Sequence, residues 1–210
     1  VAAAVISVSG ALFASAQDRK SIAPPAGHPL SEIISGYEFR TAETKAQQDD
    51  DFENPGFLWV DRGEDLWMAK EGEAGKACTS CHNSASQSMA DVGTRYPAWD
   101  DKVGKPVSLE QRINICRKDN MKAKPWKWES NQLLSMTAYV RHQSRGKPVN
   151  VKTDGPMQSW AEKGKKLYYT RVGQLDMSCS NCHEDNYGKH ARADMLSQGQ
   201  SNGFPTYRMK

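Results

Sequence analysis

The chain has no apolar run close to the roughly 20 residues that a helix needs to cross a bilayer, which excludes a membrane protein with several spans. It also has little excess charge, since 28 Lys and Arg face 25 Asp and Glu, and a net charge of +3 does not indicate a nucleic-acid-binding protein. Only 25% of the 210 residues are charged and 38% are hydrophobic, so we expect one or two packed domains rather than a disordered polyelectrolyte. Cysteine is scarce too, but four of its five copies lie in two short clusters.

Residues 1–16 are small, apolar and uncharged, and they end in Ala14-Ser15-Ala16 before a polar stretch. This pattern predicts a secretory signal peptide, and a short buried helix is the alternative. Because the basic start and the initiating Met are absent, we expect the chain to begin inside the signal. The mature protein should then begin near Gln17 and be exported to the periplasm. In an oxidising compartment paired cysteines usually form disulfides, so the spacing of the cysteines has to decide their role.

Both cysteine clusters, at residues 78–82 and 179–183, read C-x-x-C-H, the attachment motif of c-type haem. Two thiols one helical turn apart can both bond to the haem vinyl groups, which places the following His against the iron. A thioredoxin-like redox pair would not need that His, and a four-cysteine zinc site normally has its pairs closer than 101 residues apart. The sequence therefore predicts two covalent haem c groups, attached through Cys78, Cys81, Cys179 and Cys182, with His82 and His183 as axial iron ligands.

Helical patterns around the motifs predict a mainly α fold with two tandem class I cytochrome c-like domains. Residues 63–76 and 160–170 fit the opening helices of the two domains, and residues 131–145 fit the closing helix of the first. Turn-forming residues between Gly146 and Pro156 predict a linker.

We therefore expect an N-terminal domain at residues 17–150 and a C-terminal domain at residues 151–210. Only 27 residues follow His183, and their glycines and proline disfavour a helix. The second domain is thus expected to be incomplete, without its closing helix.

The sixth ligand of the first iron is expected between residues 83 and 130, which contain Met89, Cys116 and Met121 but no His. Met is the usual choice, yet Cys116 is the only cysteine without a haem bond to make. Several neighbouring side chains are basic and favour a thiolate: Arg112, Arg117, Lys118 and Lys122. The alternative for Cys116 is a small buried hydrophobe. A thiolate ligand would stabilise ferric iron and make this haem a low-potential centre.

Other candidate ligands are weaker. His142 falls on the predicted closing helix, where we expect a surface position rather than ligation. For the second haem the candidates are His190, Met195 and Met209, each with an equally plausible surface or core role.

Charge is uneven along the chain. Residues 41–65 hold eight acids and two bases, and residues 101–128 hold eight bases and three acids. Such runs usually form solvated faces, and the functional alternative is electrostatic steering of anions or of a charged partner toward a haem edge.

Six stretches of the sequence together resemble the SoxA family, the larger subunit of the SoxAX cytochrome complex of bacterial sulfur oxidation. The stretches are YEFR (37–40), QDDDFENPG (48–56), LEQRINICR (109–117), SRGKPV (144–149), GKKLYYTRVGQL (164–175) and LSQGQSNGFPTY (196–207). Some family members lack the first haem motif, and this sequence resembles the diheme form that retains it.

The resemblance implies that Cys116 is the distal thiolate of the first haem, opposite His82. It also implies a second distal cysteine at the other haem, modified to a persulfide, which is the catalytic centre in the family. That cysteine follows the FPTYR-like stretch by a few dozen residues, and the chain ends at Lys210 without it. The catalytic residue is therefore unknown, and the printed chain is expected to be inactive alone.

The activity that the resemblance implies is that of an L-cysteine S-thiosulfotransferase. Thiosulfate is joined oxidatively to a cysteine of the SoxYZ carrier protein, and electrons leave through a monohaem SoxX subunit to a soluble cytochrome c. The alternatives are a thiosulfate dehydrogenase, which couples two thiosulfates to tetrathionate, and a diheme electron-transfer cytochrome without a substrate.

Overall fold

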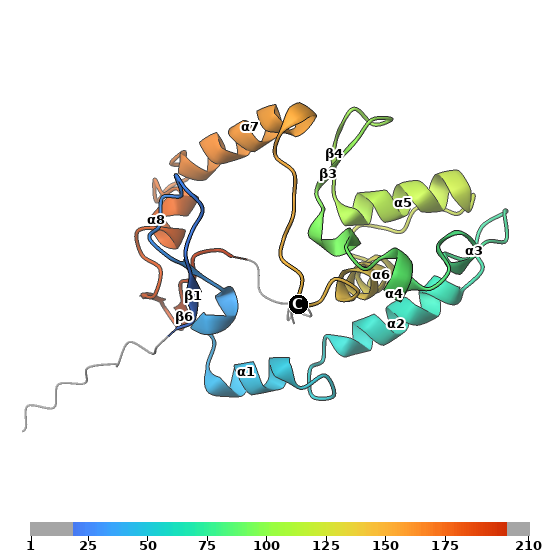
Figure 1. The fold of residues 1–210 in the computed structure, drawn as a ribbon, viewed down its shortest axis with the longest axis horizontal. Helices are drawn as coiled ribbons and strands as arrows, with labels where there is room; N and C mark the ends of the chain where they lie inside the picture. The colour runs from blue at the N-terminus through green and yellow to red at the C-terminus, as the bar shows by residue number, and fades with distance from the viewer. Residues whose placement is uncertain (1–18, 201–210) are drawn as a thin grey trace, which may run out of the picture.

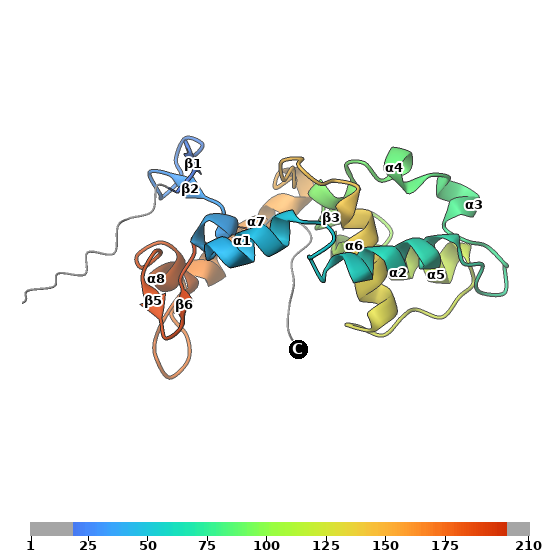
Figure 2. The same cartoon turned by 90° about the horizontal axis from the view of Figure 1, so that it is seen from below.

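The computed structural model describes residues 19–200. The predicted signal peptide, Met209 and the last part of the 196–207 motif lie outside the described residues. The fold is mainly helical, as predicted, with strands of only two or three residues. None of the helices in residues 19–200 has the length and apolar character to span a membrane. Figures 1 and 2 show two groups of elements, joined by the connection between α1 and α2 and by the long connection from α6 to α7.

The first group contains three long helices, α2 (Phe57–Met68), α5 (Leu109–Asn120) and α6 (Asn131–His142). Shorter elements complete it: α3 (Thr79–His82), α4 (Ala85–Ser88), η2 (Val92–Thr94) and the antiparallel pair β3 (Ala98–Asp100) and β4 (Lys105–Val107).

Local sequence explains where two of these helices begin. At α5, Ser108 accepts a hydrogen bond from the backbone of Gln111, and the Gln111 side chain accepts one from the backbone N–H of Ser108. At α6, the hydroxyl of Ser130 caps the helix through the backbone N–H of Leu133. Both caps satisfy N–H groups that a helix start leaves without a partner.

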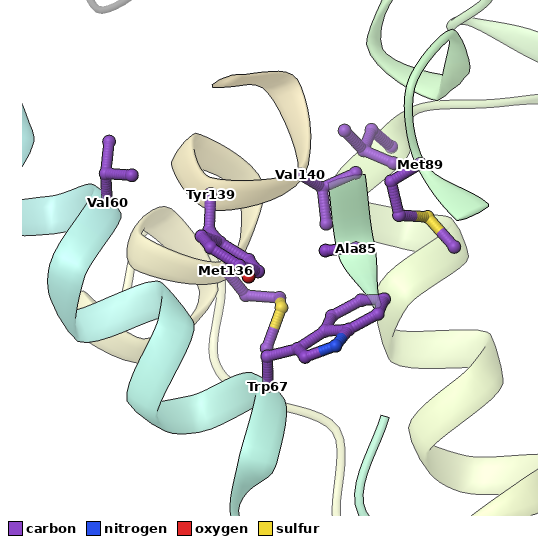
Figure 3. Close-up of a cluster of buried hydrophobic side chains, with 8 residues drawn as sticks. Val60, Trp67, Ala85, Met89, Met136, Tyr139 and Val140 are labelled. Carbon is purple, nitrogen blue, oxygen red and sulfur yellow. The ribbon is translucent and has the colours of Figure 1, made fainter. Parts of the chain in front are cut away.

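The core of the first group lies between α2 and α6. Figure 3 shows Met136 and Tyr139, from α6, turned toward Trp67 of α2, and all three are buried. The helices approach closely at Gly63, where an added Cβ would clash with the backbone oxygen of Ser135 and lie 2.5 Å from the Cβ of Tyr139. A glycine is required at this crossing because no larger residue fits.

The second group contains η3 (Gly155–Met157), α7 (Gln158–Tyr169), α8 (Cys179–His183) and the antiparallel pair β5 (His190–Ala191) and β6 (Asp194–Met195). The N-terminal elements lie beside it in both views: β1 (Ser21–Ile22), β2 (Ile33–Ile34), η1 (Gly36–Phe39) and α1 (Ala42–Asp49).

Gln198 joins the N-terminal strands to the second group. Its side chain accepts a hydrogen bond from the backbone N–H of Ile34 (2.8 Å) and donates one to the carbonyl of Glu32 (3.1 Å). Nearby, the rings of Phe39 and Tyr187 meet edge to face at 6.5 Å. The beginning of the described chain therefore packs on the segment around the second cysteine motif. The predicted division at residue 150 did not anticipate these contacts.

One segment of each group repeats with a constant offset of 101 residues. Helix α7 follows α2 at this offset, and the isolated bridge Val172–Met177 follows the bridge Glu71–Lys76. The turn at each motif is also the same: the backbone N–H of Ala77 donates to the Ser80 side chain (3.0 Å), and that of Ser178 donates to the Asn181 side chain (2.9 Å). Each C-x-x-C-H motif thus sits in the same helix–bridge–turn context.

The predicted helix boundaries are confirmed at two places and wrong at a third. Helices were predicted at residues 131–145 and 160–170, and the structure has them at 131–142 and 158–169. The first opening helix was predicted at residues 63–76 but runs from Phe57 to Met68. The helix ends where Ala69 becomes extended, and a helix cannot resume over residues 71–76, because Gly72 and Gly75 have φ values of +70° and +55° and lie in the turn closed by the bridge Glu71–Lys76.

Candidate functional site

A cavity in the first group lies between α2, α3, α5 and α6. It encloses about 770 Å³ of space, including the part open to solvent. Its walls are mostly apolar, and they carry two cysteines, one histidine and two arginines: Trp67, Cys78, His82, Met89, Val92, Tyr96, Leu109, Arg112, Ile113, Cys116, Arg117, Met121, Trp126, Met136 and Val140. This lining, apolar with a few polar groups, suits a large flat cofactor.

Three residues predicted from the sequence as haem contacts meet at this cavity: Cys78, His82 and Cys116. Cys81 is exposed and does not line it. Cys78 begins the single turn of α3, in which the backbone N–H groups of Cys81 and His82 both donate to its carbonyl. This turn places the thiol of Cys81 three residues after that of Cys78, and the imidazole of His82 directly after Cys81.

The thiol of Cys78 is held in its neutral form. Burial raises its pKa to about 11, and the negative charge of a Cys116 thiolate contributes in the same direction, while the guanidinium of Arg117 opposes both. The two cysteines therefore lie within electrostatic range of each other, although 38 residues separate them in the chain.

All three predicted distal candidates of the first haem line the cavity, so proximity alone does not select one. Met89 and Met121 are buried, and Met89 packs in the core cluster with Trp67 and Val140. The Sγ of Cys116 accepts a hydrogen bond from the side-chain amide of Asn120 at 3.5 Å.

His142 does not line the cavity. It is half-buried, and its ring meets Phe57 edge to face at 5.2 Å. The prediction set a surface position against ligation, and the residue is only partly exposed because α2 covers this face of α6.

Arg117 is a charged residue in the cavity wall with only 5% of its surface exposed. Its guanidinium lies over the ring of Trp126 at 3.5 Å and donates hydrogen bonds to Glu71 (2.6 Å) and to the carbonyl of Lys124 (3.1 Å). Its buried Nε has no hydrogen-bond partner among the described residues. A buried donor without a partner in an apolar cavity fits a cofactor that brings an acidic group, as haem does with its propionates.

At the second motif, the orientation of His183 is the most informative contact. Its Nδ1 lies 2.8 Å from the carbonyl oxygen of Ser197. A carbonyl only accepts, so Nδ1 carries the proton and Nε2 keeps its lone pair. Metal-binding histidines are commonly oriented by such a contact.

The other residues predicted near the second haem are more open. Cys179 is exposed and Cys182 is half-buried. His190 is exposed on β5, and the sulfur of Met195 accepts a hydrogen bond from Arg19 at 3.1 Å. Within residues 19–200, no three His, Cys, Asp or Glu side chains gather in a way that could hold a metal ion.

Sequence reasoning missed three contacts of the sites: the carbonyl of Ser197, the amide of Asn120 and the pairing of Arg117 with Glu71. A backbone carbonyl carries no sequence signal. Asn120 could have been found, because residues at i and i+4 of a helix share a face and Cys116 had already been singled out.

A C-x-x-C-H turn whose first thiol and histidine face an apolar cavity defines a c-type cytochrome, a protein that carries haem c. Comparison with known proteins agrees, since the profile of the family "SoxA/TsdA, cytochrome c domain" matches residues 62–149.

Two relatives named L-cysteine S-thiosulfotransferase subunit SoxA have high identity to the chain. The protein from Pseudaminobacter salicylatoxidans is 52% identical over 187 residues, which are 89% of this chain and 65% of the relative. That from Paracoccus pantotrophus is 47% identical over 190 residues, which are 90% of this chain and 65% of the relative. The chain thus spans about two thirds of the length of these relatives.

A solved structure agrees with the sequence relatives. The crystal structure of SoxXA from P. pantotrophus contains a chain that matches with a TM-score of 0.84 and 46% identity, covering 91% of this chain and 73% of that one. The chain belongs to the SoxA family.

Proposed function

We propose that the chain is the diheme cytochrome part of an L-cysteine S-thiosulfotransferase, the enzyme that joins thiosulfate to a cysteine of a carrier protein. The observation that carries this proposal is the meeting of Cys78, His82 and Cys116 at one cavity, in a chain 52% identical to a relative of that name. Sulfur–sulfur bond formation is an oxidation, and the proposal needs a one-electron acceptor such as haem.

Two haem groups are proposed. The first is attached through Cys78 and Cys81, with His82 and Cys116 as its axial ligands; the second is attached through Cys179 and Cys182, with His183 as one axial ligand. The repeat of 101 residues supports the second site, because it sets both motifs in the same local structure. The same repeat supports two tandem cytochrome c-like domains. In the second domain, the carbonyl of Ser197 orients His183.

The reaction balances with two molecules of oxidised cytochrome c as the electron acceptors. Thiosulfate and the carrier thiol form one sulfur–sulfur bond, the thiol releases its proton, and two electrons leave. Haem held by the two C-x-x-C-H motifs would supply one-electron transfer, and the two electrons would pass on to soluble cytochrome c. In the family the reacting sulfur belongs to a cysteine that follows the 196–207 motif, and no residue of the printed chain is assigned that role.

The proposed partners are a monohaem cytochrome subunit like SoxX, a carrier protein like SoxYZ, thiosulfate and a soluble cytochrome c acceptor, all in the periplasm. The first of these is supported by the likeness to a chain of the SoxXA structure. Thiosulfate dehydrogenase remains the second candidate, because the matching family profile includes TsdA as well as SoxA.

The test is to express the gene that encodes this chain in a haem-maturing host, alone and with the monohaem subunit, and to supply thiosulfate, carrier and oxidised cytochrome c. The proposal expects co-purification of the two cytochromes, and a carrier cysteine that gains the mass of thiosulfate only when thiosulfate is present. Rapid tetrathionate formation without any carrier would instead establish the dehydrogenase. No thiosulfate chemistry at all would leave an electron-transfer cytochrome.

A further inference from the structure

The sulfur of Cys116 has one hydrogen-bond donor from its own helix. Asn120 follows Cys116 by four residues, so the two side chains share a face of α5, and the Asn120 Nδ2 lies 3.5 Å from Sγ. An asparagine amide nitrogen can only donate, and sulfur here can only accept.

Asn120 is not needed to finish the helix. The backbone turns away at Lys122, which has a φ of +54°, and the N–H of Ala123 returns to the carbonyl of Arg117 at 3.0 Å. Arg117 anchors this end of α5 through Glu71 and Lys124. The side chain of Asn120 is exposed, and its contact with sulfur is the one hydrogen bond found for it in residues 19–200.

A donor on a thiolate ligand changes the properties of the iron. Negative charge on sulfur stabilises the ferric state, and a hydrogen bond withdraws part of that charge. Hydrogen bonding around a ligating sulfur is thus one of the means by which a protein sets a reduction potential.

We propose that Asn120 is a positioning residue of the first haem: its amide donates to the Cys116 thiolate, fixes the orientation of the sulfur and raises the reduction potential above that of an unmodulated thiolate-ligated haem. This inference rests on the proposed ligation of haem by Cys116, and it predicts a spectroscopic effect that a purely structural residue would not produce.

The experiment uses the haem-loaded full-length protein and its Asn120→Leu, Asn120→Gln, Cys116→Met and Asp119→Leu variants. Low-spin electron paramagnetic resonance and redox titration are recorded for each. Asn120→Leu has nearly the same shape without a donor, and Asn120→Gln keeps a donor one methylene further out. Asp119→Leu is the control, since Asp119 is exposed on the same turn and loss of its negative charge would raise the potential rather than lower it.

In Asn120→Leu we expect the low-spin signal of one haem to shift. Its ferric-to-ferrous ratio at a fixed solution potential should rise about tenfold, equivalent to about 59 mV for a one-electron couple. Asn120→Gln should restore part of the shift, and Asp119→Leu should leave the signal unchanged.

Two results distinguish a failure of the proposed role of Asn120 from a failure of the proposed ligation by Cys116. If Cys116→Met changes one low-spin signal but Asn120→Leu changes neither signal nor potential, the role of Asn120 is overturned and the ligation stands. If Cys116→Met leaves every low-spin signal unchanged, Cys116 is not a ligand, and both proposals about this haem are overturned.

Discussion

Arg117 links the proposed ligand helix to the haem-attachment turn. Through Glu71 it reaches the bridge that precedes Cys78, and through Trp126 it reaches the loop between α5 and α6. Burying an arginine costs free energy unless its charge is paired. Here the carboxylate of Glu71 and the ring of Trp126 both stabilise the charge of Arg117. Arg117, the residue after Cys116, therefore connects α5 to the bridge Glu71–Lys76 and to the loop between α5 and α6.

His142 gives a prediction for the pH dependence of stability. Burial, and secondarily the positive charge of Arg145, lower its pKa in the folded protein below the unfolded value of about 6.5. The unfolded state then binds more protons as the pH falls below about 6.5. His142 therefore does not reduce stability above that pH, and stability falls as the pH drops from about 6.5 through the lowered pKa of the folded protein.

We expect His142→Gln to make the free energy of unfolding less pH-dependent between pH 7 and pH 5, by up to one proton, in denaturant titrations. An equal slope in the parent and in His142→Gln would contradict the prediction.

At the scale of elements, the repeat supplies a matched pair of glycines. Gly63 of α2 and Gly164 of α7 occupy the same position in the two helices. Gly63 lies against α6, whereas an added Cβ at Gly164 would have nothing within 4 Å among the described residues. The same residue type thus serves a close helix crossing in one copy and has no such contact in the other.

Gly63→Ala should destabilise the 210-residue chain by about 1–3 kcal/mol, because α2 and α6 must separate to admit the methyl group. Gly164→Ala should stabilise it by about 0.5–1 kcal/mol through helix propensity. Thermal or denaturant unfolding of both variants measures the difference. Equal effects at the two positions would show that the α2–α6 contact does not limit stability.

The elements that sequence reasoning predicted well are those with a local cause. Helices α6 and α7 show helical spacing of apolar residues, and the motif turns follow from C-x-x-C-H itself. The predicted end of α2 was wrong because Gly72 and Gly75 adopt left-handed conformations, although the residue pattern of the segment is typical of a helix. The sequence alone did not select among Cys116, Met89 and Met121 as the iron ligand, because all three fall in one segment, and the structure brings all three to the same cavity.

At the scale of the molecule, the N-terminal segment and the second motif depend on each other. Gln198 is 4% exposed and satisfies two backbone groups of the β1–β2 region, the N–H of Ile34 and the carbonyl of Glu32. These contacts could not be predicted from the sequence, because they join residues more than 160 positions apart and one partner in each bond is backbone.

Gln198→Ala removes both bonds and leaves two backbone groups without partners. The cost should be about 1–3 kcal/mol for each group that stays buried. We expect faster hydrogen exchange in residues 19–40 and 179–200, with α2, α5 and α6 unaffected. Equal hydrogen-exchange protection of residues 19–40 in the variant and the parent would mean that other contacts hold this segment in place.

The same long-range pairing sets an order of assembly. The contact of Gly63 with Ser135 closes a loop of 72 residues, less than half of the 164 residues that separate Ile34 from Gln198, so the first group can form as soon as residue 142 is available. The β1–β2 region, although synthesised earlier, must wait for Gln198 before it finds its partner. The earliest part of the described chain is thus among the last to be fixed, and until then it is open to proteases and to chaperones.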